Sequence, residues 1–355
     1  MGVDFQTPEL LTALVAAHRY LAELKGCAAS IPNQAILINT LALQEAKASS
    51  EVESYVTTHD ELFQADLRIA EWVSPAAKEV SRYREALTDG FKRMREQQGI
   101  LSNSTLIALF QMLKNSGEAF RTNGGTVLKN EKTGATVFVP PQDGASVLAH
   151  MQALERFVNE DAACDLDPLI KMALIHHQFE SIHPFSDGNG RIGRILCVLH
   201  LVQAGLLDSP VLYLSRYINR NKSDYYRLLQ AVRDEASNVA AWQAWVKFML
   251  NGVAQTAKQA VQLVGGMREL MTETKRRMRA DTPKLYSQDL LNNLFRHPYT
   301  RIEFVQDDLG ITRQTAARYL RQLAQAGLVQ EHSLGKHVYF INVPLVQLLT
   351  QIELG

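Results

Sequence analysis

The chain has 355 residues, enough for two or three domains with well-buried cores. Hydrophobic residues make up 46% of it and charged residues 21%, the proportions of an ordinary globular protein. Its 37 basic residues balance 37 acidic ones, so no overall field favours nucleic acid or a membrane surface. The three scattered cysteines, Cys27, Cys164 and Cys197, favour a reducing compartment over a disulfide framework.

The N-terminal segment does not resemble a secretion signal. It carries Asp4 and Glu9 and lacks both a basic start and a short apolar core. No uninterrupted apolar run in the chain is long enough to cross a bilayer. These features predict a cytoplasmic protein without a membrane partner.

Most of the chain has helical periodicity, which predicts a mainly α-helical fold. Thr7 and Pro8 provide an N-cap and a first-turn proline for the first helix, and Gly205 ends the helix that begins near residue 190. Apolar residues recur at three- and four-residue steps, which predicts helices at 8–24, 33–48, 76–97, 103–115, 143–160, 168–182, 190–205, 222–235 and 239–263.

Residues 124–141 interrupt this helical pattern. Thr126–Lys129 and Ala135–Val139 have the composition of short β-strands, and Lys132-Thr133-Gly134 suits the turn between them. Pro140-Pro141 then stops the second strand. Because an isolated hairpin is only marginally stable, this one is expected to lean on the helices or on a partner. A surface hairpin without a function is the alternative.

The stretch 183–194, HPFSDGNGRIGR, combines several groups that suit a triphosphate. Its glycines let backbone N–H groups approach phosphate oxygens, and the helix that follows points its positive end at them. Arg191 and Arg194 lie near the first turn of that helix, where guanidinium groups can grip phosphate. Asp187 suits Mg²⁺ that bridges two phosphates, and His183 suits proton removal at neutral pH. The stretch predicts phosphoryl or nucleotidyl transfer.

Two alternative interpretations fit this region less well. The spacing Gly188-x-Gly190-x-x-Gly193 also fits a dinucleotide-binding fingerprint, but such a fingerprint follows a strand, and residues 168–182 have helical spacing. A zinc site built from His176, His177 and His183 would need a carboxylate or cysteine at a defined spacing, and none occurs. His176 and His177 are therefore expected to pack or form hydrogen bonds.

The order of residues 183–194 matches every fixed position of the Fic family signature, H-P-F-x-[D/E]-G-N-G-R-x-x-R. The chain therefore resembles Fic proteins. The resemblance implies a Fic-type helical bundle with a hairpin flap, and transfer of AMP from ATP to a Ser, Thr or Tyr hydroxyl of a protein. It implies ATP as substrate and Mg²⁺ as cofactor. Residues 124–141 would form this flap. It is expected to hold a segment of the target protein as an added strand along its edge.

The resemblance also implies roles within the stretch. His183 is the expected catalytic base and Asp187 the expected Mg²⁺ ligand. Arg194 is expected to grip the γ-phosphate, while Arg191 reaches the β-phosphate or braces the loop. The side chain of Asn189 would add a donor to the backbone. The implied ATP-binding residues are Gly188, Asn189, Gly190, Arg191, Ile192, Gly193 and Arg194.

Residues 221–226, NKSDYY, resemble the family segment that opens the helix beside the nucleotide base. Tyr225 is the candidate for the wall against adenine, since an aromatic face stacks on a base. Core packing is the alternative for Tyr225 and the preferred interpretation for Tyr226. Some relatives carry an asparagine eight residues after that tyrosine, where this chain has Arg233.

Ser49 to Ser54, SSEVES, resembles the Fic inhibitory motif [S/T]-x-x-x-E-[G/N], except that Ser54 occupies the last position. The resemblance implies that Glu53, on a helix near 45–54, pairs with Arg194 and competes with the γ-phosphate. The alternative is a solvated helix glutamate. Residues 57–63, TTHDELF, also resemble the segment that follows the motif in relatives with a C-terminal winged helix.

The C-terminal part has the pattern of a winged helix-turn-helix. A helix at 302–309 leads into a turn at Gly310-Ile311, Thr312 caps a second helix at 313–326, and strands at 328–332 and 337–341 follow. Residues 281–355 carry seven basic and seven acidic side chains, but Arg313, Arg318 and Arg321 have no acidic neighbour on their helix. DNA binding through 302–341 and a protein-contact role are both left open.

The expected organisation is an N-terminal helical region at 1–98, a catalytic core at 99–265, a linker helix at 266–282 and a winged helix at 283–355. A homodimer is expected. Transfer of UMP, phosphate or phosphocholine, or removal of AMP, is the alternative on the same scaffold. A DNA-binding transcriptional regulator that responds to nucleotide is the alternative from another class.

Overall fold

Helices make up most of the protein in the computed structural model, which describes residues 3–67, 73–129, 133–160, 166–334 and 337–351. The described strands form one two-stranded and one three-stranded sheet. The predicted fold class, a Fic-type helical bundle with a small hairpin and a C-terminal winged helix, is confirmed. Among the described residues, no helix combines the length and apolar character that a membrane span requires.

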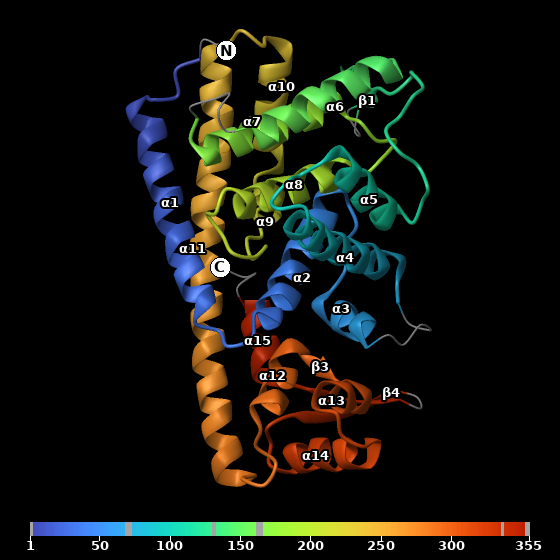
Figure 1. Cartoon of the computed structure of the whole chain (residues 1–355), viewed down its shortest axis with the longest axis vertical. Coiled ribbons are helices and arrows are strands. Elements are labelled where there is room, and N and C mark those ends of the chain that lie inside the picture. Colours follow the sequence, from blue (N-terminus) through green and yellow to red (C-terminus); the bar gives the residue numbers. More distant parts are fainter. Residues whose placement is uncertain (1–2, 68–72, 130–132, 161–165, 335–336, 352–355) are drawn as a thin grey trace.

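Two helices run side by side along the long axis of the molecule, α1 (Pro8–Ala29) and α11 (Val239–Asp281) (Figure 1). The Thr7 side chain caps α1 as predicted. The 43 residues of α11 form one helix, whereas the sequence predicted an end near 263 and a separate linker helix. Gly265 and Gly266 lie inside α11 because packing overrides their low helix propensity. A Cβ on Gly266 would lie 2.9 Å from Leu348 Cδ1 of α15 (Val343–Gln351), so this glycine permits a close helix contact.

The centre of the molecule is α8 (Asn189–Gln203), which is buried on all sides from Arg191 to Leu201. A helix that is buried around its whole circumference must have neighbouring elements on every face. These neighbours are α7 (Pro168–Ile182), α2 (Gln34–Val52), α4 (Pro75–Glu96) and α5 (Asn103–Lys114). The helices α6 (Gly144–Asn159) and α10 (Lys222–Asp234) complete the upper part of the bundle in Figure 1.

The predicted hairpin is present but short. Strands β1 (Leu128–Lys129) and β2 (Thr136–Phe138) pair antiparallel, with Leu128 opposite Phe138. Lys132, in the expected turn, lies outside the described residues. The exposed side chains of Val137 and Val139 leave this hairpin only partly covered.

The winged helix comprises α12 (Gln288–Arg296), β3 (Tyr299–Thr300), α13 (Ile302–Leu309), α14 (Arg313–Gln325), β4 (Gln330–Leu334) and β5 (His337–Ile341). The strand order is β3-β5-β4. Gly310 makes the turn between α13 and α14 with φ of 64°, and Thr312 caps α14. The boundaries of α13 and α14 agree with the sequence prediction to within one residue, β4 begins two residues later than expected, and α12 and β3 were not predicted.

The winged helix packs against the N-terminal helices, including α3 (His59–Asp66), which the sequence did not predict. Gln44 of α2 donates to the Leu349 carbonyl at 3.2 Å. The hydroxyl of Tyr299 donates to Asp60 of α3, and its ring lies 5.3 Å from that of Phe63. These contacts tie both α2 and α3 to the C-terminal domain.

Candidate active site

His183 ends α7 in a left-handed conformation, with φ of 50° and ψ of 59°. Arg121 holds it there, because Arg121 Nε donates to the His183 carbonyl at 2.8 Å and its backbone N–H donates to the Pro184 carbonyl at 2.8 Å. Burial, with the charges of Arg233 and Arg121, lowers the pKa of His183 to about 4. The imidazole is therefore neutral at neutral pH and able to accept a proton.

Phe185 anchors the loop after His183 in the core. Its ring is fully buried and stacks on Phe110, with ring centroids 4.2 Å apart. The rings of Phe120 and Phe179 also contact it. Since four aromatic rings meet at this point, the loop has a fixed position relative to α5 and α7.

The loop turns into α8 at Gly188, whose φ of 73° favours glycine. No side chain caps this end of α8, so the first N–H groups of the helix have no capping partner from a side chain. Such an end binds anions. The side chain of Asn189, predicted as a further donor, instead closes the loop: its Nδ2 donates to the Phe185 carbonyl at 2.9 Å and its Oδ1 accepts from the Phe185 N–H at 2.8 Å.

Asp187 lies at the mouth of the loop and is more than half exposed. Lys114 Nζ, at the end of α5, donates to its Oδ2 at 2.6 Å, and the Gly188 N–H donates to Oδ1 at 2.6 Å. Although partial burial opposes ionisation, Lys114 lowers the pKa of Asp187 below its ordinary value. The chemistry of this group fits Mg²⁺, which takes one or two carboxylates together with phosphate oxygens and water. Lys114 is paired with Oδ2 of this carboxylate, and the sequence analysis did not identify Lys114 as a site residue.

Arg191 points into the protein and is 1% exposed. It forms an ion pair with Glu79 of α4, and its guanidinium lies 5.4 Å from the centre of the Tyr55 ring. Asp187 is 3.8 Å away. Of the two predicted roles, these contacts support bracing of the loop, because the guanidinium is already engaged with protein groups. Glu79 was not predicted because it is more than a hundred residues away in the sequence.

Arg194 of α8 is buried beside the C-terminal end of α2. There it contacts Ser49 and Glu53, the two residues of the expected inhibitory motif. Its Nε donates to Ser49 Oγ at 2.8 Å, and its Nη2 donates to the Ser49 carbonyl and to Glu53 Oε1, each at 3.0 Å. Although burial opposes the charge, Glu53 and the surrounding acidic groups raise the pKa of Arg194 above its usual value. The structure thus brings Ser49, Glu53 and Arg194 together as the sequence predicted.

Glu53 also lies against the start of α8. A Cβ added to Gly190 would collide with its carboxylate. A Cβ on Gly193 would lie 3.1 Å from Glu180 Oε1 and 3.2 Å from His176 Nδ1. Both glycines are therefore needed for close approach of neighbouring groups, while Ile192 between them is fully buried in the core.

The structure places Tyr225, the candidate for the wall against adenine, in the core. Its side chain is 2% exposed, and its hydroxyl lies 2.9 Å from His176 Nε2. Its ring packs near Trp245 and Phe248, so the core-packing alternative describes it. Tyr226, expected in the core, is instead 45% exposed because it lies on the outer face of the same helix.

His176 and His177 pack in the core, as predicted. Burial lowers the pKa of His176 to about 3 and that of His177 to about 4. Both rings lie against Trp245. Within the described parts of the chain, no group of three His, Cys, Asp or Glu side chains is placed to hold a metal ion, so the zinc alternative has no support there.

Arg233 is a further site residue whose place the sequence did not indicate. Its guanidinium lies 4.3 Å from the centre of the Phe138 ring in β2, and its Nη2 donates to the Glu180 carbonyl at 2.7 Å. Its charge also acts on the pKa of His183. Arg233 therefore connects the hairpin to the end of α7, where the imidazole lies.

Family models match the chain along most of its length. The model described as "Fic/DOC family N-terminal" matches residues 11–92, and the one described as "Fic/DOC family" matches residues 100–201, including the loop. The chain belongs to the Fic family. Residues 270–345 match the model described as "Protein adenylyltransferase SoFic-like, C-terminal domain".

Curated Fic relatives resemble the chain over a limited segment. The protein named "Protein adenylyltransferase Fic" from Drosophila yakuba is 38% identical over 96 residues, which are 27% of this chain and 18% of that protein. The protein of the same name from Drosophila melanogaster is 35% identical over 96 residues, which are again 27% of this chain and 18% of that protein. The matched segment spans under a fifth of these relatives.

Solved Fic structures share the fold over a larger part of the chain. A Fic family protein from Desulfovibrio desulfuricans G20 has a TM-score of 0.59 at 18% identity and covers 96% of this chain and 98% of that one. Fic-1 from C. elegans, residues 134–508, has a TM-score of 0.54 at 16% identity, with 74% of each chain covered. At this level of identity the likeness concerns the fold.

Proposed function

We propose that this Fic protein transfers AMP from ATP to a Ser, Thr or Tyr hydroxyl of a target protein. The observation that carries the proposal is the juxtaposition, within twelve residues, of the neutral imidazole of His183 and the uncapped N-terminus of α8. The first provides a base and the second an anion site. The relatives named as protein adenylyltransferases support the choice of reaction.

In the proposed reaction the target hydroxyl oxygen attacks the α-phosphorus of ATP. The new bond joins that oxygen to the α-phosphorus, and the bond from the α-phosphorus to the bridging oxygen of pyrophosphate breaks. His183 takes the hydroxyl proton, and pyrophosphate leaves with the electron pair. The first N–H groups of α8 stabilise the negative charge of the phosphates. Asp187 would hold Mg²⁺, which supplies charge neutralisation at the phosphates when bound.

We further propose that Glu53 inhibits this reaction. It occupies Arg194, the residue expected to grip the γ-phosphate, and its carboxylate lies against Gly190 at the anion-binding end of α8. A carboxylate in that position both uses the donor that the triphosphate needs and repels the triphosphate itself. Release of Glu53 from Arg194 would then be the activating step.

The target segment is proposed to dock along the hairpin 124–141. The hairpin has only two described strands, exposes Val137 and Val139, and is joined through Phe138 and Arg233 to the end of α7. An extended peptide added to its edge would run past His183. Homodimerisation stays a prediction of the sequence.

The test of the reaction is intact mass spectrometry of the parent chain, of Glu53→Gly, which relieves the proposed inhibition, and of Glu53→Gly/His183→Ala. Each protein is incubated with Mg²⁺, a host lysate and, in separate samples, ATP, UTP, GTP or CDP-choline. The account predicts adducts of one adenylyl group on Glu53→Gly samples with ATP alone, fewer in the parent, and a loss of about 10²- to 10⁴-fold when His183→Ala is added to Glu53→Gly. His150, exposed on α6, provides the matched control His150→Ala, which should behave as the parent.

Each alternative has its own signature in this experiment. A phosphate-sized adduct, or adducts from the other donors, would assign a different transferred group. Undiminished adenylylation by His183→Ala would remove His183 as the base. ATP binding without any adduct, in parent and Glu53 variants alike, would favour the nucleotide-sensing regulator.

A further inference from the structure

The helix α14 lies at one end of the molecule, with its outer face turned away from the rest of the protein (Figure 1). Ala316, Leu320 and Leu323 form its buried face. On the other side, Gln314, Arg318, Arg321 and Gln322 are exposed. The second helix of this helix-turn-helix therefore presents a long polar face to solvent.

The exposed face of α14 has one sign of charge. The helix carries Arg313, Arg318 and Arg321 and no acidic residue. Arg313 is paired with Glu303 of α13, whereas no ion pair joins Arg318 or Arg321 to an acidic residue within the described parts of the chain. Arginine and glutamine are the side chains that bind guanine and adenine edges in the major groove.

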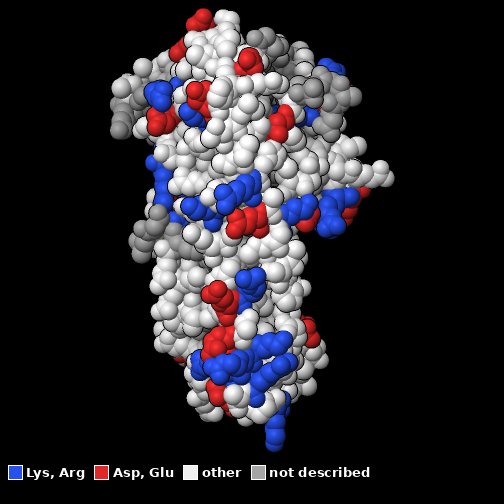
Figure 2. Space-filling model, turned by 90° about the vertical axis from the view of Figure 1, so that its left-hand side faces the viewer, with Lys and Arg blue, Asp and Glu red and all other residues white. Residues whose placement is uncertain are grey.

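A second group of basic residues lies beside the C-terminal end of α14. Residues 273–284 carry five basic and two acidic side chains; Arg276, Arg279 and Lys284 are exposed, and Arg276 is paired with Glu273 at 2.7 Å. Arg277 joins the two regions, because its Nη2 donates to the carbonyls of Ala326 and Gly327 just after α14. In Figure 2, Lys and Arg accordingly outnumber Asp and Glu at the lower end of the molecule.

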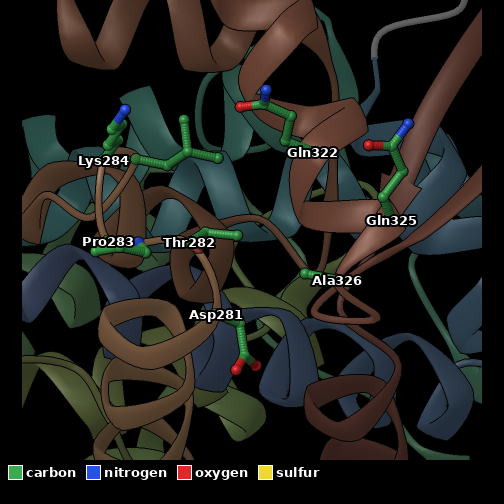
Figure 3. Close-up of a pocket in the computed structure, with 8 residues that line it drawn as sticks. Asp281, Thr282, Pro283, Lys284, Gln322, Gln325 and Ala326 are labelled. Carbon is green, nitrogen blue, oxygen red and sulfur yellow. The ribbon is translucent and has the colours of Figure 1, made fainter.

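The segment between α11 and α12 completes this surface, which we call the basic end: Arg276, Arg279, Lys284, Arg318 and Arg321. A pocket of about 460 Å³ separates Asp281–Leu285 from Gln322, Gln325 and Ala326 of the α14 end (Figure 3). Lys284 thus stands across a shallow gap from the polar face of α14. Arg279 is held by the Tyr286 ring at 4.6 Å, which keeps its charge at this place.

We propose that the basic end binds double-stranded DNA. The whole chain has no net charge, so the positive charge gathered here is a local feature rather than the result of a basic composition. In this arrangement α14 enters the major groove, and Arg276, Arg279 and Lys284 contact phosphates flanking its C-terminal end. The surface lies at the opposite end of the molecule from the hairpin and would leave it open to a target protein (Figure 1).

Two other occupants fit this surface less well. A membrane-binding helix needs an apolar face to insert, yet in residues 283–334 and 337–351 no large apolar side chain is among the strongly exposed ones. A protein interface usually has aromatic residues and few lysines at its centre. The basic end instead combines arginine, lysine and glutamine, as phosphate and base contacts require.

The proposal is tested by fluorescence anisotropy with a labelled random-sequence duplex of about 25 base pairs, titrated with the full chain from about 50 to 200 mM KCl. The variant Arg318→Ala/Arg321→Ala should bind about tenfold more weakly or worse, and its log–log salt slope should fall by about two. The matched control is Arg19→Ala/Lys92→Ala, which removes two exposed charges from α1 and α4. It should bind as the parent does.

Several outcomes would overturn the proposal. Absence of duplex binding by the parent at the lowest salt concentration is one. Equal weakening by the basic-end and control variants is another, since it would show general charge attraction. Binding to anionic lipid vesicles, or to an acidic protein, without binding to the duplex would assign the surface to a different partner. Circular dichroism of the variant shows whether a loss of binding reflects unfolding.

Discussion

At the scale of single residues, the backbone of Ser54 shows why the family's inhibitory motif has glycine or asparagine after its glutamate. It follows Glu53 with φ of 68°, in the left-handed region that only glycine enters readily and asparagine tolerates. The family pattern has glycine or asparagine at this position, and this chain has serine. The turn that places Glu53 against Arg194 is therefore strained in this protein.

Ser54→Gly should relieve that strain. We expect the free energy of unfolding to rise by about 0.5–1 kcal/mol, the difference between the left-handed penalty and the greater entropy that glycine loses on folding. Urea denaturation measures it. Ser50→Gly, inside α2, is the control and should lower stability. A lower stability for Ser54→Gly would show that the serine side chain contributes more than its backbone strain costs.

Glu180 provides a pH-dependent contribution next to the active loop. Burial raises its pKa to about 7 from the ordinary 4.5, despite the opposing charges of Arg194 and Arg233. Between these two values the folded protein keeps a proton that the unfolded chain releases. The resulting stabilisation is fully present below about pH 4.5 and is lost as the pH rises through about 7.

Glu180→Gln should remove this dependence. The difference in unfolding free energy between parent and variant should change by on the order of 2–3 kcal/mol between pH 4.5 and 8. The buried histidines act in the opposite direction, losing stability as pH falls below 6.5, but they are common to both proteins and cancel in the difference. Urea titrations at several pH values test this. Parallel curves for the two proteins would contradict it.

The loop residues were predictable because their chemistry is local in the sequence. His183, Asp187 and Arg194 follow from one stretch of twelve residues, and Glu53 from a second short motif. Their partners were not predictable. Lys114, Glu79 and Arg121 lie some 60 to 110 residues from the loop residues that they contact, and no periodicity or spacing marks them. The surroundings of Tyr225 and Tyr226 were not predictable for a related reason, since only the packing of α10 decides which of two adjacent tyrosines faces the core.

At the scale of elements, long amphipathic helices were predicted well, whereas most short or interrupted ones, α13 excepted, were not. The helices α3, α9 (Ser215–Arg220), α12 and α15 have at most nine residues, too few for a clear periodicity. The continuity of α11 was missed because two adjacent glycines suggest an end. In the fold, Gly266 instead makes room for Leu348.

The contact between the winged helix and α3 suggests that the C-terminal domain steadies the segment that carries Glu53, the proposed inhibitory residue. Tyr299 of β3 lies between Phe63 of α3 and Tyr339 of β5, with ring centroids 5.3 and 5.5 Å away. Glu53 and Ser54 lie in the short connection between α2 and α3. Both helices that flank this connection contact the winged helix.

Tyr299→Ala should loosen this connection. Loss of the buried ring is expected to cost about 3–5 kcal/mol, while Tyr299→Phe, which loses only the hydrogen bond to Asp60, should cost about 1 kcal/mol. Amide hydrogen exchange in residues 53–66 should accelerate in the alanine variant and change little in the phenylalanine variant. Unchanged exchange there in Tyr299→Ala would show that the segment does not depend on the winged helix.

At the scale of the whole molecule, α2 contacts the active loop, the core of the bundle and the C-terminal domain. Its C-terminal end carries Ser49 and Glu53 against Arg194, its apolar residues pack in the core, and Gln44 donates to the Leu349 carbonyl of α15 in the C-terminal domain. The proposed DNA-binding surface lies at the far end of that same domain. The arrangement places the C-terminal domain, the proposed inhibitory helix and the active loop in one continuous packed structure.

The central claim is that Glu53 withholds Arg194 from ATP. Its most direct test is the rate of adenylyl transfer, with ATP affinity measured in parallel, in Glu53→Gly and the parent. Glu160→Gly is the matched control, since Glu160 is also the C-cap of a helix but lies away from the loop. Loss of a charge-assisted hydrogen bond of about 1.5–3 kcal/mol predicts a rise of roughly ten- to a hundredfold in Glu53→Gly, with the control unchanged. Equal transfer and equal ATP affinity in Glu53→Gly and the parent would contradict the account.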